Sequence, residues 1–255
     1  MGRPLNKATL RSLCARTALI LMTLSCLCSC GENHNPGTAL NDAKRLAAKG
    51  DYEGALAKHI WFHDNVLAIN PNYYGVRLSF ALDDWLKLGQ QYPKALQKLK
   101  NIRDEKTSRL IAGEVNRELF HDVQAINEHL DESQATVELF KRIEATNPAF
   151  AARIYDSAEE ALLQAKEYGL AKKYLRDPME RLSIAKRNLE SGMQFAKTSQ
   201  NGESSRRAFE SIFTQTVLRI IIILRETGDK ELAKSIQTEA LKTYDTASLR
   251  DALNH

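Results

Sequence analysis

Cysteine is absent from most of this chain. All four cysteines lie within the first thirty of its 255 residues: Cys14, Cys26, Cys28 and Cys30. The residues that follow can therefore form neither an internal disulfide framework nor a cysteine-based zinc site. Whatever holds that part of the chain together must come from apolar burial and hydrogen bonding.

Glycine, proline and long apolar runs are also scarce. The chain has 12 Gly and 6 Pro, too few for a collagen-like or low-complexity protein, while 43% hydrophobic residues suffice for a core. The two most apolar stretches, 17–25 and 217–224, are far shorter than the roughly 20 residues of a membrane-spanning helix. Arg219 interrupts the second, so we expect a buried core helix there.

The positive charge is concentrated at one end. Four of the 36 basic residues precede residue 17, where no acidic residue occurs, so the remaining basic residues balance the 32 acidic ones. A neutral body without a basic excess argues against a nucleic-acid-binding protein. We therefore expect no nucleic-acid partner.

The first thirty residues have the order of a bacterial export signal. A basic segment, 1–16, precedes a short apolar run, and small residues and cysteines follow. The sequence Leu27-Cys28-Ser29-Cys30 resembles the lipobox of bacterial lipoproteins, with Leu at −3 and a small residue at −1. That resemblance implies a signal peptide over 1–29 and acylation of Cys30, the new N-terminal residue.

Other interpretations of this segment remain open. Cys26 is a second candidate for lipid attachment, Cys28 fits less well because Leu27 occupies −1, and an ordinary cleaved signal is a third possibility. Gly31 after the cysteine resembles the enterobacterial pattern for the outer membrane. We expect a tether over 30–38 and an outer-membrane protein facing the periplasm.

The body of the chain repeats a helix–turn–helix pattern. Five turn blocks are each closed by a small residue, at positions 55, 95, 136, 171 and 233, and only the last interval is long. Repetition near 34–40 residues is typical of an α-solenoid. Asp177-Pro178 predicts the start of an extra helix over 179–196, and 197–205 reads as a polar insertion loop.

The repeats resemble the tetratricopeptide repeat (TPR). The third unit carries the family's pattern of large, small, aromatic and proline positions in Phe120, Val123, Thr136, Phe140 and Pro148. Units two to five depart from it where a small residue is expected, with Asp83, Gln124, Glu159 and Ile221. The resemblance implies an all-α fold over 39–255, a right-handed α-solenoid of about five irregular TPR-like hairpins.

The same resemblance implies a partner surface. In TPR proteins the first helix of each pair lines a concave groove that binds a protein or peptide. Carried onto this chain, the positions of that groove are Arg77, Phe80, Asp84, Lys87, Glu118, His121, Glu128, His129, Arg153, Asp156, Glu160 and Arg225. Their mixed charge suits a peptide rather than a polyanion, so we expect a non-catalytic scaffold with no cofactor.

Two alternatives concern catalysis and location. Glu118, His121, Glu128 and His129 could converge as a metal or acid–base site of an enzyme built in a solenoid. The other alternative is a cytosolic interaction scaffold in which residues 1–30 are not a signal. His59 and His63 share a helix face, but the metalloprotease pattern is absent because Ile60 follows His59, and we expect no metal site there.

Overall fold

The structure is a computed structural model that describes residues 35–253, and every regular element in that range is helical. Cys30 and the alternative lipid-attachment residues lie outside the described residues. The elements are α1 Pro36–Ala48, α2 Tyr52–Ile69, η1 Pro71–Tyr73, α3 Tyr74–Arg77, α4 Phe80–Gln91, α5 Pro93–Ile111, α6 Arg117–His129, α7 Ser133–Thr146, α8 Pro148–Gln164, α9 Tyr168–Tyr174, α10 Pro178–Thr198, α11 Gly202–Glu226, α12 Lys230–Leu241 and α13 Ala247–Asp251.

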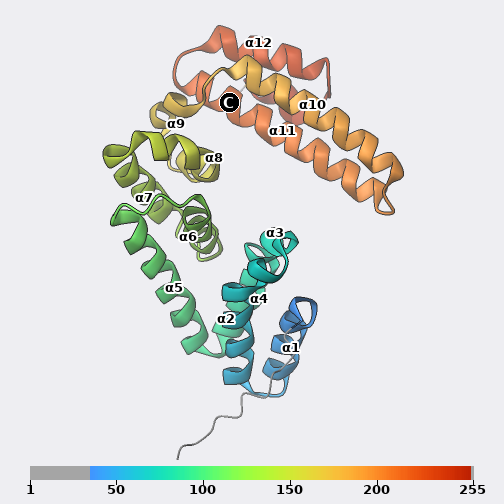
Figure 1. The fold of residues 1–255 in the computed structure, drawn as a ribbon. Coiled ribbons are helices and arrows are strands. Elements are labelled where there is room, and N and C mark those ends of the chain that lie inside the picture. Colours follow the sequence, from blue (N-terminus) through green and yellow to red (C-terminus); the bar gives the residue numbers. More distant parts are fainter. Residues whose placement is uncertain (1–34, 254–255) are drawn as a thin grey trace, which may run out of the picture. The chain divides into compact units, whose positions relative to one another are not determined.

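These helices form successive hairpins, and each hairpin packs on the next (Figure 1). The pairs are α1 with α2, α4 with α5, α6 with α7, α8 with α9, and α11 with α12. Contacts between pairs join α2 to α4, α5 to α6, α7 to α8, and α9 to α11. Because each apolar face is covered by a neighbour in sequence, the body is an all-α solenoid, as the repeat pattern predicts.

Four of the turns inside the hairpins have the same backbone conformation. Gly50, Asp131, Lys166 and Gly228 have φ between 57° and 89°, the left-handed conformation that ends many helices. In each turn the amide of the following residue donates to the carbonyl five residues earlier, at 2.8–3.0 Å. This is the Schellman pattern, which satisfies the last carbonyls of the first helix. The turn of the second pair differs, because α5 begins at Pro93 directly after the extended residue Tyr92.

The positions that carry the TPR resemblance are core positions. Phe120, Val123, Thr136 and Phe140 are at most 1% exposed, and the matching residues of the fifth unit, such as Val217, are equally buried. Pro148 begins α8, where its missing amide hydrogen costs no helical hydrogen bond. The periodicity therefore identified the buried faces correctly.

Two predicted boundaries were wrong. The tether was expected to run to residue 38, but α1 begins at Pro36. The insertion loop over 197–205 is much shorter, because α10 continues to Thr198 and α11 starts at Gly202. A side chain at Gly202 would meet the Ala196 carbonyl oxygen at 2.5 Å, so glycine permits the tight turn. The polar residues that looked like a loop instead form the first turn of α11.

The extra helix α10 is confirmed, and side chains fix its start. The carboxylate of Asp177 accepts from the amides of Met179 at 2.8 Å and Glu180 at 3.2 Å. Arg181 donates to both oxygens of the buried Glu159 carboxylate on α8, at 2.5 and 2.6 Å. Glu159 is one of the departures from the TPR pattern, and its carboxylate attaches α10 to the stack.

None of the helices within residues 35–253 combines the length and the apolar character needed to cross a membrane. The apolar stretch near Arg219 lies inside α11, where Val217, Ile220, Ile221 and Leu224 are at most 1% exposed. Burial against α9 and α12 accounts for its composition.

Candidate partner-binding groove

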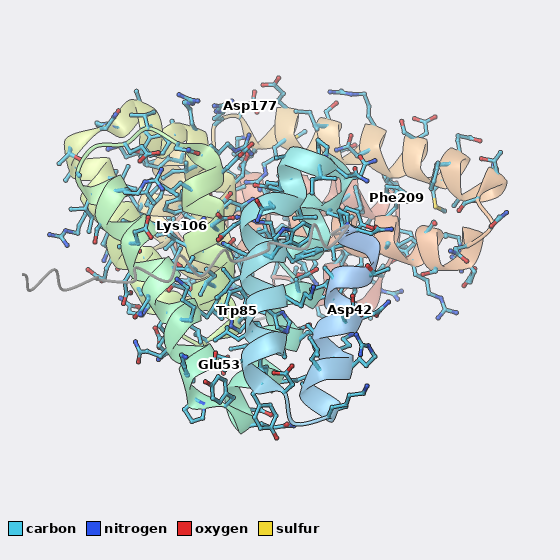
Figure 2. The ribbon with its side chains drawn as sticks, turned by 60° about the horizontal axis from the view of Figure 1, so that its bottom comes forward. Asp42, Glu53, Trp85, Lys106, Asp177 and Phe209 are labelled. Carbon is cyan, nitrogen blue, oxygen red and sulfur yellow. The ribbon has the colours of Figure 1, made fainter. Side chains whose placement is uncertain are left out.

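A cavity of about 390 Å³ lies among α8, α10, α11 and the connection that leads into α10. Its apolar lining comes mainly from the long α10–α11 pair: Ile184, Leu189, Phe209, Ile212 and Phe213. Figure 2 labels two of its lining residues, Asp177 at the start of α10 and Phe209 on α11. We call this site the α8–α11 groove.

The groove exposes large apolar side chains that a core would bury. Ile184 is 42% exposed and Ile212 is 57% exposed. Phe195, 58% exposed, packs edge-on against Phe209, with 6.4 Å between the ring centroids, and so extends the apolar surface beyond the cavity. Contiguous exposed apolar surface is typical of interaction sites, whereas single exposed residues need no explanation.

Gly192 determines where the ring of Phe209 lies. A Cβ atom at this α10 position would meet the Phe209 ring at 2.2 Å, well inside van der Waals contact. The ring can approach α10 this closely only because position 192 has no side chain. The shape of this groove wall therefore depends on one glycine of the extra helix.

The rim of the groove is acidic. Asp156, Asp177 and Glu180 line it together with Arg176 and Arg181. Arg181 is paired with Glu159 and its charge also interacts with Asp156. With Glu159 counted, four carboxylates stand against the two guanidiniums of Arg176 and Arg181, so negative charge is in excess. The side chains of Asp156 and Glu180 are exposed and have no hydrogen-bond or ion-pair partner within residues 35–253. They are open to a positively charged ligand.

Tyr155 also faces the cavity, but its hydroxyl has a structural role. Its hydroxyl donates to Glu159 at 2.7 Å. Burial, followed by the charge of Glu159 and this hydrogen bond, raises the pKa of Tyr155 far above its usual value. Its hydroxyl therefore stays protonated and acts as a structural donor.

Only one member of the predicted partner surface lines this groove. Asp156 does so from α8, and two other members lie on the same helix: Arg153 is exposed, while Glu160 accepts from Arg219 at 2.8 Å. Arg225, on α11, is turned toward the C-terminal helix and donates to the Ala252 carbonyl at 3.0 Å. The predicted surface thus meets the cavity at a single helix.

Arg77 was wrongly placed on the surface. It is 6% exposed, and its guanidinium makes a two-point contact with the buried Asp122 carboxylate, one bond of which is 2.7 Å. Its Nε donates to the His63 carbonyl at 2.8 Å. Arg77 is the last residue of α3, in an irregular segment of η1 and α3 that breaks the repeat spacing, so a position carried over from the family pattern fell into the core.

The charges around Asp122 are mutually compensated. Burial raises the pKa of its carboxyl, but hydrogen bonds and charge from Arg77, together with the charge of Lys106, outweigh burial and hold the pKa below 3.8. Buried charges persist when they are paired in this way. This cluster joins the irregular segment to α5 and α6.

The remaining predicted members are scattered over α4 and α6. Phe80 is 69% exposed, and Asp84 pairs with Lys44 at 2.9 Å and with Lys87 at 3.5 Å. On α6, Glu118 and Glu128 are both exposed. Phe80, Lys87, Glu118 and Glu128 are accessible, whereas the Asp84 side chain is only 9% exposed, and none of these residues lines the α8–α11 groove.

The histidines of the enzyme alternative have separate partners. Nδ1 of His121 lies 2.8 Å from the Tyr74 hydroxyl, and burial lowers the pKa of His121. His129 lies 3.5 Å from Asp83 and 2.8 Å from the Ala125 carbonyl. Across residues 35–253, no three His, Cys, Asp or Glu side chains gather in a metal-binding arrangement. Among these residues, Glu118, His121, Glu128 and His129 therefore form no metal-binding cluster.

His59 and His63 lie in the aromatic core. Their rings lie 5.5 and 6.1 Å from the buried Trp85 ring, and both are under 5% exposed. Burial lowers the pKa of His59 to about 4 and that of His63 to about 3, so both rings are neutral near pH 7.

The groove residues on α10 were not predicted from the sequence. Glu180, Ile184 and Asn188 belong to a helix that has no counterpart in the repeat, so the family pattern assigned them no role. Their spacing of four residues was a usable signal, because it places a carboxylate, an isoleucine and an amide on one helix face.

Comparison with known proteins yields little for this chain. No protein-family model matches it, and no curated protein matches it. One solved structure, described as the crystal structure of MamA protein, is 16% identical and covers 85% of this chain and 93% of its own, with a TM-score of 0.34. Because that superposition is loose, the fold is assigned from the chain's own helices and turns.

Proposed function

We propose that this protein is a non-catalytic scaffold of the bacterial cell envelope, anchored to a membrane by lipid, that binds a protein or peptide partner in the α8–α11 groove. The observation that carries the proposal is the groove itself, where Ile184 and Ile212 remain exposed beside unpaired carboxylates. A rigid stack of hairpins that presents such a surface suits binding of a protein segment.

The chemistry of the groove favours binding over reaction. Its most buried polar groups, Tyr155 and Arg181, are both satisfied by Glu159 and hold helices together. No hydrogen bond joins the exposed carboxylates of Asp156 and Glu180 to another titratable side chain of the described residues. A catalytic site would require such a pair within hydrogen-bonding reach.

The anchor is supported by the sequence alone. If Cys30 carries the lipid, five residues lie between it and Pro36, the first residue of α1, which makes six Cα-to-Cα steps. An extended chain of that length spans about 20 Å at most. The folded body would therefore remain next to the membrane surface, so its partner would be membrane-bound or periplasmic.

Lipid attachment is tested by labelling cells with an alkyne-bearing palmitate analogue and fractionating their membranes. We expect label and membrane association for the natural protein and for Cys26→Ser, and loss of both for Cys30→Ser. Mass spectrometry of the N-terminus should find acylated Cys30. Label retained in Cys30→Ser, or a soluble chain beginning at Met1, would contradict the anchor.

Partner binding is tested by placing a photo-crosslinking amino acid at Ile212 in the groove or at Lys234 on α12. Lys234 is exposed and lies outside the groove, so it is a matched control. We expect one discrete envelope-protein adduct from position 212 and none from position 234. Absence of an adduct at 212, or the same adduct at both positions, would refute the groove as the binding site.

A further inference from the structure

The α8–α11 groove continues as an elongated apolar track along the hairpin. On α10, Ile184, Asn188 and Phe195 are 4 and 7 residues apart, so at 100° per residue their side chains leave the helix within about 40° of one another. At a rise of 1.5 Å per residue, Ile184 and Phe195 are about 16 Å apart along the axis. Phe195 is not among the residues that line the cavity, so the track extends beyond it.

The facing helix continues the same track. Phe209 and Ile212 of α11 line the cavity, and the Phe209 ring contacts Phe195. Three of these four large side chains are at least 42% exposed: Ile184, Phe195 and Ile212. An apolar strip of this length matches one face of a helix of about eleven residues, whose anchors recur every three or four positions.

Charge is confined to one end of the track. Asp156, Asp177 and Glu180 lie where α10 begins, and the apolar residues extend from there toward the α10–α11 turn. Arg176 is the only basic side chain of the groove that is not already paired with a carboxylate of the described residues. The excess of negative charge at this end favours a positively charged ligand group.

From this geometry we propose that the groove selects an amphipathic helix of a partner protein, with apolar residues along one face and lysine or arginine residues near one end of that face. The inference rests on the proposed scaffold function and specifies the chemistry of its partner. The site combines α8 and α11, the first helices of two hairpins, with the extra helix α10, which has no counterpart in the repeat. Its specificity is therefore a property of this chain.

The test uses the folded protein and two designed 18-residue helical peptides, labelled for fluorescence anisotropy. Both carry leucine at every third or fourth position, and the flanking residues near one end are lysine in the first and glutamate in the second. We expect the lysine peptide to bind at least tenfold more tightly, with affinity falling as salt is raised. Equal affinity, or preference for the glutamate peptide, would overturn the proposal.

Matched variants assign that preference to the groove. Asp156→Lys with Glu180→Lys should reverse the preference between the two peptides. Asp64→Lys with Glu138→Lys, an equal charge change at exposed sites on α2 and α7, should leave it unchanged. A reversal in the control variant, or none in the groove variant, would show that the attraction is not local to this rim.

The apolar part of the proposal has its own variant. Ile184→Ser with Ile212→Ser alters exposed side chains, so the helical circular dichroism should be retained while the affinity for the lysine peptide falls at least tenfold. Unchanged affinity would refute the track. If the crosslinking partner at position 212 is found but neither peptide shows the expected preference, the scaffold function stands and the partner chemistry is wrong.

Discussion

Two buried histidines give the core a dependence on pH. His59 and His63 are neutral in the folded protein because burial holds their pKa values near 4 and 3, against 6.5 for an exposed ring. Below pH 6.5 the two histidine rings bind protons in the unfolded chain but stay unprotonated in the folded protein until the pH approaches their lowered pKa values. The free energy of unfolding must therefore fall as the pH drops, and His59 should contribute about 3 kcal/mol of that fall by pH 4.

His59→Phe should remove the contribution of His59 to the fall in the free energy of unfolding at low pH. The Nδ1 atom of His59 has no hydrogen-bond partner, and its ring stacks on Trp85, so a phenyl ring loses little at neutral pH. Relative to the natural protein, the variant should gain about 3 kcal/mol between pH 7.5 and pH 4. Urea denaturation across this range measures the difference; parallel curves would show that His59 is not held neutral.

At the scale of the element, the hairpin turns are built from one backbone geometry and four different residues. Gly50 and Gly228 adopt it without strain, while Asp131 and Lys166 adopt φ values of 57° and 59° with a side chain present. A non-glycine residue in this conformation costs about 1 kcal/mol or more. The turns at Asp131 and Lys166 are therefore strained, whereas the turns at Gly50 and Gly228 are not.

Asp131→Gly and Lys166→Gly should each raise the free energy of unfolding by about 0.5–1 kcal/mol, since relief of strain outweighs the added freedom of the unfolded chain. Glu138→Gly, an exposed position inside α7, serves as the control and should lower it by about 1 kcal/mol. Urea denaturation gives all three values. If the turn variants were destabilised as much as the control, left-handed strain would not be present at these turns.

The extra helix α10 is attached to the repeat stack by a buried ion pair. Glu159 replaces the small residue that the TPR pattern places against a neighbouring helix, and Arg181 neutralises the resulting buried carboxylate. Neither residue is explained without the other. Together they hold α10 beside α8, which brings Asp156 and Glu180 to one rim.

At the scale of the whole described body, each hairpin is stabilised by its neighbours, and the two ends of the stack differ. At the N-terminal end, α1 fully buries only Ala39 and Ala43. Near the C-terminal end, α12 buries Ala233, Ile236 and Ala240, and α13 adds the fully buried Leu249 against it. Opening of the first hairpin should therefore cost the least free energy.

We expect the amides of α1 to exchange with deuterium at least tenfold faster than those of α12, and those of α8, which buries eight residues, to exchange slowest. Hydrogen exchange read by mass spectrometry measures this order directly. Since α12 lies near the other end of the helical stack, it controls for opening that any terminal hairpin would show. Equal protection of α1 and α8 would mean that the body unfolds as one cooperative unit.

The sequence by itself determined the repeat, its turns and most of the buried faces. Phe120, Phe140 and Val217 could be assigned to the core because helical periodicity and turn residues are local signals, set by the chain within a few residues. The cap of α10 at Asp177 was local in the same sense.

Only the tertiary structure determined which side chains of these helices are buried and which form a common surface. Arg77 is enclosed because Asp122, 45 residues later, supplies its counter-charge. Ile184 and Ile212 form one surface because α10 folds back on α11, where Gly192 admits the Phe209 ring. These contacts join residues that are distant in sequence. Local sequence patterns do not predict which distant residues come together.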